Sequence, residues 1–155
     1  MFDEAVQAFL RTGCALIVAT VDDDGEPRAS RGWGVDVVSH DPPSVRLLVD
    51  ADDEVTLEQL AGGRSVAITA ASVRTLESIQ LKGHGRGVEP GTPEDQARAD
   101  RYVDAFFRDI EDTDGTERRL LVRIRPDRVA ACTVDLVEAF DQTPGPTAGA
   151  RRPMT

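Results

Sequence analysis

The feature that most constrains this chain is a series of short apolar segments, the first three of which are joined by turns too brief to hold a helix. The first pair is separated by DDDGEP and the second pair by a turn containing DPP. Parallel strands need a crossover of a dozen or more residues, so these neighbours should pair antiparallel. The segments, rich in β-branched residues, are 15–21, 28–38, 44–50 and 65–72. The pattern predicts a mainly β fold, a mostly antiparallel barrel with peripheral helices.

A fifth strand is predicted over Glu77–Gly87, ESIQLKGHGRG, where polar and apolar residues alternate. Ile79 and Leu81 should point into the barrel, and the opposite side should carry a row of hydrogen-bond donors. That row is Ser78, Gln80, Lys82, His84 and Arg86. The glycines in this strand indicate a bend, a bulge or the close approach of another backbone or a ligand.

The remaining segments predict three helices and two more strands. The helices are expected over 2–11, 54–63 and 93–114, and the last begins with the cap Thr92 and with Pro93 at its first position. Strands are expected over 118–125 and 128–137. We therefore expect one domain over residues 1–140, and a tail over 141–155 with too much Pro and Gly for regular structure.

Composition excludes several classes of function. The net charge of -10 and the absence of a Lys/Arg run argue against a nucleic-acid partner. No apolar run approaches the ~20 residues that span a bilayer, and the N-terminus is acidic, so no membrane contact and a cytoplasmic location are expected. Cys14 and Cys132 have no metal-binding spacing, so we predict two buried thiols and no metal site.

Catalytic motifs are missing, including GxSxG, the P-loop, HExxH and GxGxxG between a strand and a helix. Catalytic residues therefore stay unassigned. PRASRGWG offers a hydroxyl, a guanidinium and a flat ring at Ser30, Arg31 and Trp33, a set that suits an aromatic, anionic ligand. The same alternation is also typical of any half-exposed strand.

The order of segments resembles a known family. ATVDDDGEPRASRGW, VRLLVD before a short helix, SVAIT and TLESIQLKGHGRG follow one another as in the FMN-binding split-barrel proteins related to pyridoxamine 5'-phosphate oxidase. The closing FDQTPGP is also similar to a tail of some bacterial members. The resemblance implies an antiparallel split β-barrel of about six to seven strands, a homodimer, and FMN sites at the subunit interface.

Carried over by position, the resemblance implies a set of flavin-lining residues. They are Arg31, Gly32 and Trp33 in the second strand, Leu48 and Val49 in the third, and either Ser78 or Gln80 in the fifth. Lys82, farther along the polar row, could reach a phosphate or the partner subunit. Together with Ser30, these residues form the predicted cofactor site.

Two departures from the family matter. Where the oxidases carry a Ser-Arg-Lys-like run for the FMN phosphate, this chain has DADDE over 50–54, whose four carboxylates would repel a phosphate. Either Arg31, Arg64 or Lys82 compensates, or flavin binding is weak or lost. The Trp- and Arg-rich ending of true pyridoxamine phosphate oxidases is also missing, which argues against that activity.

Two interpretations follow. In the first, the chain is an FMN-dependent oxidoreductase of unknown substrate and electron donor, in which the flavin performs the chemistry. In the second, it is a split-barrel binding module for haem, a deazaflavin or no cofactor, acting as a dimeric sensing or interaction protein. The DADDE segment favours the second.

Overall fold

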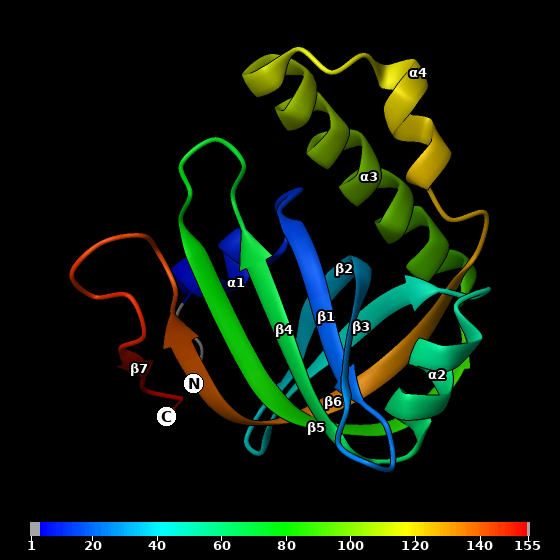
Figure 1. The fold of residues 1–155 in the computed structure, drawn as a ribbon, viewed down its shortest axis with the longest axis vertical. Helices are drawn as coiled ribbons and strands as arrows, with labels where there is room; N and C mark the ends of the chain where they lie inside the picture. The colour runs from blue at the N-terminus through cyan, green and yellow to red at the C-terminus, as the bar shows by residue number, and fades with distance from the viewer. Residues whose placement is uncertain (1–3, 155) are drawn as a thin grey trace.

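Six antiparallel strands close into a ring in the computed structural model, which describes residues 4–154 (Figure 1). The hydrogen-bonded order is β3-β2-β1-β4-β5-β6, and β6 pairs back onto β3. The strands are β1 (Ala15–Val21), β2 (Pro27–His40), β3 (Pro43–Asp50), β4 (Ser65–Ala71), β5 (Ser78–Pro90) and β6 (Val129–Asp141). The predicted antiparallel split barrel is confirmed.

Helices lie at the periphery of this ring, as predicted. They are α1 (Glu4–Leu10), α2 (Glu54–Ala61), α3 (Pro93–Asp114) and α4 (Arg118–Leu121). Phe2, placed by the sequence on the first helix, lies outside the described residues. Thr92 and Asp95 cap α3 reciprocally, and Gly115 ends it in the left-handed conformation. No helix within residues 4–154 is long and apolar enough to cross a membrane.

The strand predicted over 118–125 is wrong, because this segment forms α4 and a 3-10 turn, Val122–Ile124. Arg118 forms ion pairs with Asp104 and Glu111 of α3, at 2.9 and 2.8 Å, and Leu121 is buried. The segment therefore lies against α3 (Figure 1). It could not add a strand beside the first half of β6, because β3 pairs with one edge of that strand and β5 with the other.

The tail is more ordered than its composition predicts. After Asp141 the chain turns, and β7 (Arg151–Arg152) pairs with Phe140 and Ala139 of β6. Two backbone hydrogen bonds hold the return, from the Gly149 N–H to the Asp141 carbonyl at 2.7 Å and from the Asp141 N–H to the Ala150 carbonyl at 2.9 Å. The expectation of no regular structure is wrong for these two residues.

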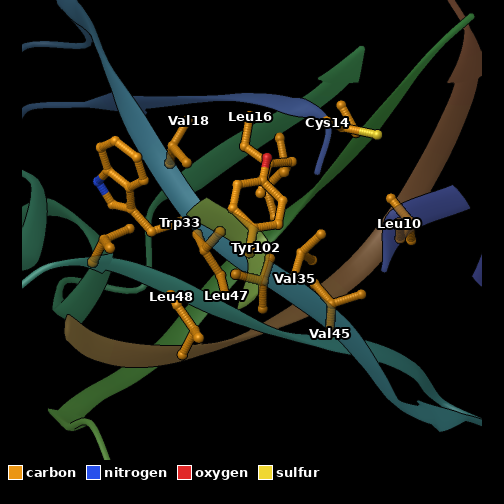
Figure 2. Packing of buried hydrophobic residues seen from close by; sticks show 14 of the residues in the cluster. Leu10, Cys14, Leu16, Val18, Trp33, Val35, Val45, Leu47, Leu48 and Tyr102 are labelled. Carbon is orange, nitrogen blue, oxygen red and sulfur yellow. The ribbon is translucent and has the colours of Figure 1, made fainter. Parts of the chain in front are cut away.

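One apolar core fills the ring and continues beneath α3 (Figure 2). Leu16 and Val18 of β1, Leu47 of β3 and Tyr102 of α3 lie close together there. Each large apolar side chain buried in this way stabilises the fold by roughly 1.5–3 kcal/mol. Cys14 and Cys132 are buried free thiols, as predicted.

Two glycines of β5 lie where the backbone of another element comes very close to the strand. A Cβ atom on Gly83 would lie 1.9 Å from the Asp135 carbonyl oxygen of β6, and one on Gly85 would lie 2.2 Å from the Leu60 carbonyl oxygen of α2. The pairing of β5 with β6 shifts register next to both glycines. Backbone contact explains Gly83 and Gly85, whereas Gly87 has open space around it and adopts a positive φ of 94°, which favours glycine.

Candidate functional site

Four neighbouring strands carry a row of side chains on the outside of the barrel. Arg31 of β2 lies opposite Ile17 of β1, Ile17 lies opposite Thr69 of β4, and Thr69 lies opposite Gln80 of β5. Directly opposed residues point to the same side of a sheet. Ile17 is 40% exposed whereas the alternate residues of β1 are buried, so this side faces outward. We call Arg31, Ile17, Thr69 and Gln80 the outer row.

Arg31 ends the outer row beside α3. Its guanidinium carbon lies 6.0 Å from the centre of the Trp33 ring and 5.7 Å from that of the Phe106 ring. Within residues 4–154 it has no ion-pair partner, whereas most arginines of this chain do. A half-buried guanidinium with unused N–H donors is suited to bind an acidic or carbonyl group.

Tyr102 lies close to this guanidinium. Burial raises the pKa of the Tyr102 hydroxyl well above its usual range, and the positive charge of Arg31 opposes that shift only in part. The hydroxyl has no hydrogen-bond partner in the described part of the chain. It therefore stays a neutral donor at physiological pH.

Ser78 and Gln80 differ in what they still offer to a ligand. The Ser78 hydroxyl is buried and donates to the Leu76 carbonyl at 2.9 Å, and the Ser78 backbone N–H donates to Thr143. Gln80 is partly exposed, and its amide nitrogen donates to Thr69 Oγ1 at 3.1 Å. That bond fixes the orientation of the Gln80 amide and leaves its carbonyl oxygen free to accept a hydrogen bond from a ligand. Gln80 is therefore better placed than Ser78 for a ligand contact.

Lys82 is next to Gln80 on the same face. Its Nζ lies 4.8 Å from the centre of the Phe140 ring, a cation–π contact, and the residue is opposed by Ala67 and Glu138. It forms no ion pair with any described residue, and it lines a cavity of about 240 Å³ together with His84. Its ammonium group is therefore available to an anion.

Three predicted residues are not on this face. Trp33, Leu48 and Val49 are at most 3% exposed and belong to the core (Figure 2). The β2–β3 register shifts between Gly32 and Gly34, so Trp33 occupies a bulge. Of these three residues, Trp33 lies next to the outer row, because its ring is 6.0 Å from the Arg31 guanidinium.

Ser30 and Gly32 lie on the inner side of β2. Ser30 is opposite Val18, and its hydroxyl is buried without a hydrogen-bond partner among residues 4–154. A Cβ on Gly32 would lie 3.0 Å from the Leu16 Cβ, so this position packs tightly on the core. The strand register thus places Arg31, Gln80 and Lys82 of the predicted site on one face. Trp33 contacts the Arg31 guanidinium from the core, whereas Ser30, Gly32, Leu48, Val49 and the turn-bound Ser78 are not among the groups that this face presents.

The acidic segment 50–54, which we call the acidic loop, forms hydrogen bonds and ion pairs with neighbouring residues. Asp53 caps α2 by accepting from Thr56, and Arg28 lies 3.2 Å from its carboxylate. Burial alone would raise the pKa of Asp53, but the Thr56 hydrogen bonds and Arg28 hold it below its usual value. Asp52 pairs with Arg128 at 3.1 Å. Arg64, a suggested compensating cation, instead pairs with Asp23.

Several residues of this face were not singled out from the sequence. Ile17 and Thr69 join Arg31 to Gln80, and Phe140 and Phe106 stack on the two cations. Alternation within each strand places Thr69 on the outside, but only the strand register shows that it lies opposite Gln80.

Solved structures with the same fold are only distantly related in sequence. HupZ of Group A Streptococcus aligns at a TM-score of 0.58 with 15% identity, over 96% of this chain and 100% of that one. An F420 reductase aligns at 0.58 with 14% identity, over 89% and 98%. A pyridoxamine 5'-phosphate oxidase-related, FMN binding protein of Nostoc punctiforme aligns at 0.50 with 15% identity, over 92% and 84%. Comparison with curated protein sequences finds no match.

A family model provides the decisive comparison. The model described as pyridoxamine 5'-phosphate oxidase matches residues 2–133, from the first helix into β6, and so includes every strand of the outer row. The chain belongs to the pyridoxamine 5'-phosphate oxidase family.

Proposed function

We propose that this protein binds FMN on the face that carries the outer row and acts as a flavin-dependent oxidoreductase. The observation that carries the proposal is the row itself. Arg31 and Gln80 lie at its two ends, and the exposed Ile17 lies between them on the same face. An apolar strip between two polar groups suits a flat ring that is polar along its edges.

The residues of this face fit the ring of a flavin better than its phosphate. Gln80 and Arg31 can hydrogen-bond ring oxygens and nitrogens, and Ile17 can pack on the ring. For the phosphate, Arg31 and Lys82 are the predicted cations that no described carboxylate neutralises. Repulsion from the acidic loop is reduced because Arg28 and Arg128 each pair with one of its four carboxylates.

A bound flavin would supply the two-electron chemistry, and the protein would bind and orient it. Arg31 would hold an electron-rich edge of the ring by charge-assisted hydrogen bonds. Gln80, fixed by Thr69, would set the ring's orientation from the other end of the row. This division of labour needs no nucleophile or general base from the chain, in keeping with the missing catalytic motifs.

We also propose that two copies pair through this face. Its side chains are small at Ala19 and Ala67 and apolar at Ile17, so a flat partner surface could pack closely. A homodimer would cover Ile17 and exclude water from the flavin. Replacing Ile17 with Asp should give a monomer by sedimentation, whereas Val38→Asp, a matched change at an exposed valine of β2, should not. A wild-type monomer would contradict the interface.

The test of flavin binding is titration of FMN into the purified protein, followed by fluorescence quenching and thermal melting. We expect Arg31→Ala to weaken FMN binding at least tenfold, about 1.4 kcal/mol. Arg108→Ala removes an exposed arginine of α3 and should leave the affinity unchanged. Failure of FMN to quench or stabilise the wild-type protein would refute the proposal, and an unchanged affinity in Arg31→Ala would exclude Arg31.

The second candidate is a binding module for another flat ligand. It is favoured by Asp50 and Glu54, which the described ion pairs leave unneutralised in the acidic loop. Parallel titrations with riboflavin, a deazaflavin and haem separate the candidates. Preference for FMN over riboflavin would support a phosphate site, and tighter binding of haem or deazaflavin would favour the alternative.

A further inference from the structure

A second cavity, separate from the outer row, lies between α1, β2 and α3. Its volume is about 370 Å³, within the range of roughly 300–1,000 Å³ that small-molecule sites occupy. None of the outer-row residues is part of its lining, although Tyr102, which lies near Arg31, is. Leu10, Val35 and Tyr102, which Figure 2 shows among the buried residues, provide its apolar wall. Each is at most 5% exposed.

Cations dominate the polar lining of this cavity. Arg11 comes from the turn that follows α1, and Arg98 and Arg101 come from α3. Asp36 of β2 is the one carboxylate in the lining. In a chain with a net charge of -10, this local excess of positive charge runs against the overall composition.

The single carboxylate is already engaged. Arg11 Nε lies 2.8 Å from Asp36 Oδ1, and an Arg98 terminal nitrogen lies 3.5 Å from Asp36 Oδ2. Each guanidinium has five N–H donors, so both arginines keep donors beyond those that Asp36 accepts. The two contacts hold Arg11 and Arg98 on different oxygens of the carboxylate. Arg98 also pairs with the exposed Glu94 at 3.4 Å, and Arg11, Arg98 and Arg101 still outnumber the two carboxylates, so the site keeps a net positive charge.

Arg101 has no ion-pair partner within residues 4–154, and it lies three residues after Arg98 on α3. Residues three apart on a helix are neighbours on its surface, so these two like charges repel each other. An anion between the two guanidinium groups would turn this repulsion into attraction.

We propose that this cavity binds a small amphipathic acid, a molecule whose phosphate or carboxylate group contacts Arg98 and Arg101 and whose ring or short chain packs on Leu10, Val35 and Tyr102. The apolar wall selects an organic acid over an inorganic anion. The two guanidinium forks suit a planar or tetrahedral oxyanion with several acceptor oxygens. Asp36 orients the cations and disfavours ligands with a second negative group near β2.

Phenyl phosphate and benzoate are suitable probes, with phenol and inorganic phosphate as partial analogues. Isothermal titration should show binding of at least one organic acid, with phenol and inorganic phosphate each at least fivefold weaker. Arg101→Gln should weaken that binding at least fivefold. Arg108→Gln, a matched change on the same helix outside the cavity, should leave it unchanged.

Amide NMR shifts at Gly34 and Asp36 on addition of the acid would place it in the cavity. The proposal would be overturned by any of four results. These are wild-type affinity for the acid in Arg101→Gln, the same loss of affinity in Arg108→Gln as in Arg101→Gln, binding of phenol as tight as that of the acid, or no binding of either acid. FMN affinity is measured on the same Arg101→Gln protein, because loss of acid binding with normal FMN binding separates the two sites. If wild-type protein binds the acid but not FMN, the cavity stands and the flavin proposal fails.

Discussion

Replacing Asp95 with Asn should destabilise the protein strongly, because this carboxylate joins α3 to β3. It accepts from Arg46 at 2.8 Å through Oδ1 and at 2.6 Å through Oδ2, and it accepts from the Thr92 N–H at 2.9 Å. Asp95 is 3% exposed. An amide of the same size removes the charge and turns one acceptor into a donor that faces other donors.

The expected cost follows from burial. Breaking a buried ion pair by removing one partner costs about 3–5 kcal/mol. Arg46 keeps a second partner, Glu89 at 2.6 Å, and its side chain is 19% exposed, so we expect the lower end, about 3 kcal/mol. Glu89→Gln is the matched control. The Glu89 side chain is 62% exposed, and its loss should cost less than about 1 kcal/mol.

The assay is urea unfolding at pH 7, comparing the midpoints of wild type and the two variants at equal slope. A cost below about 1 kcal/mol for Asp95→Asn, or an equal cost for Glu89→Gln, would refute the role assigned to burial. Asp95 lies in the first turn of α3, the helix that supplies Arg98, Arg101 and Tyr102 to the arginine-lined cavity, so this measurement tests how firmly that wall of the cavity is held.

The same carboxylate predicts a pH dependence. Hydrogen bonds from Arg46 hold the pKa of Asp95 well below its usual value, despite the opposing effect of burial. A lowered folded-state pKa means that this stabilisation is fully present above the unfolded value of about 3.9 and is lost as pH falls below it. The stability difference between wild type and Asp95→Asn should therefore shrink below about pH 4, and a constant difference down to pH 2 would contradict it.

Two further predictions concern backbone contact and the thiols. Gly83→Ala should lower the free energy of unfolding in urea by about 3 kcal/mol or more, because its Cβ would overlap the Asp135 carbonyl. The control His84→Ala, at the neighbouring position, should change it by less than about 0.5 kcal/mol. Similar costs for the two variants would argue against the overlap. Burial raises the pKa of the Cys14 and Cys132 thiols. Iodoacetamide at pH 8 should therefore label neither thiol in the folded protein and both thiols in urea. Rapid labelling of the folded protein would contradict this, because it would show that the thiols are accessible.

Local patterns in the sequence predict the barrel well but not the segment 118–125. The short turns force antiparallel pairing, and alternation in β5 correctly buries Ile79 and Leu81. In RRLLVRIR only the last four residues alternate. Leu and Arg are good helix formers, and the contacts of Arg118 with α3 decide the conformation of this segment. Those contacts are tertiary and cannot be read from the segment.

The candidate site was predictable only in part, for two physical reasons. Alternation identifies the outward side of each strand, which is how Gln80 and Lys82 were found. The bulge at Trp33 interrupts alternation in β2, so its ring packs in the core and Arg31 alone stays on the outer row. Register between strands is set by the whole sheet, and the role of Thr69 depends on it.

The buried Trp33 gives this protein a natural optical probe. It is the only tryptophan of the chain, and the Arg31 guanidinium lies 6.0 Å from its ring. Its emission therefore reports on one defined place, where the core meets the end of the outer row. A flavin on that face would accept excitation energy from the indole, whereas unfolding would shift the indole emission to longer wavelength, so one unlabelled sample distinguishes ligand binding from loss of structure.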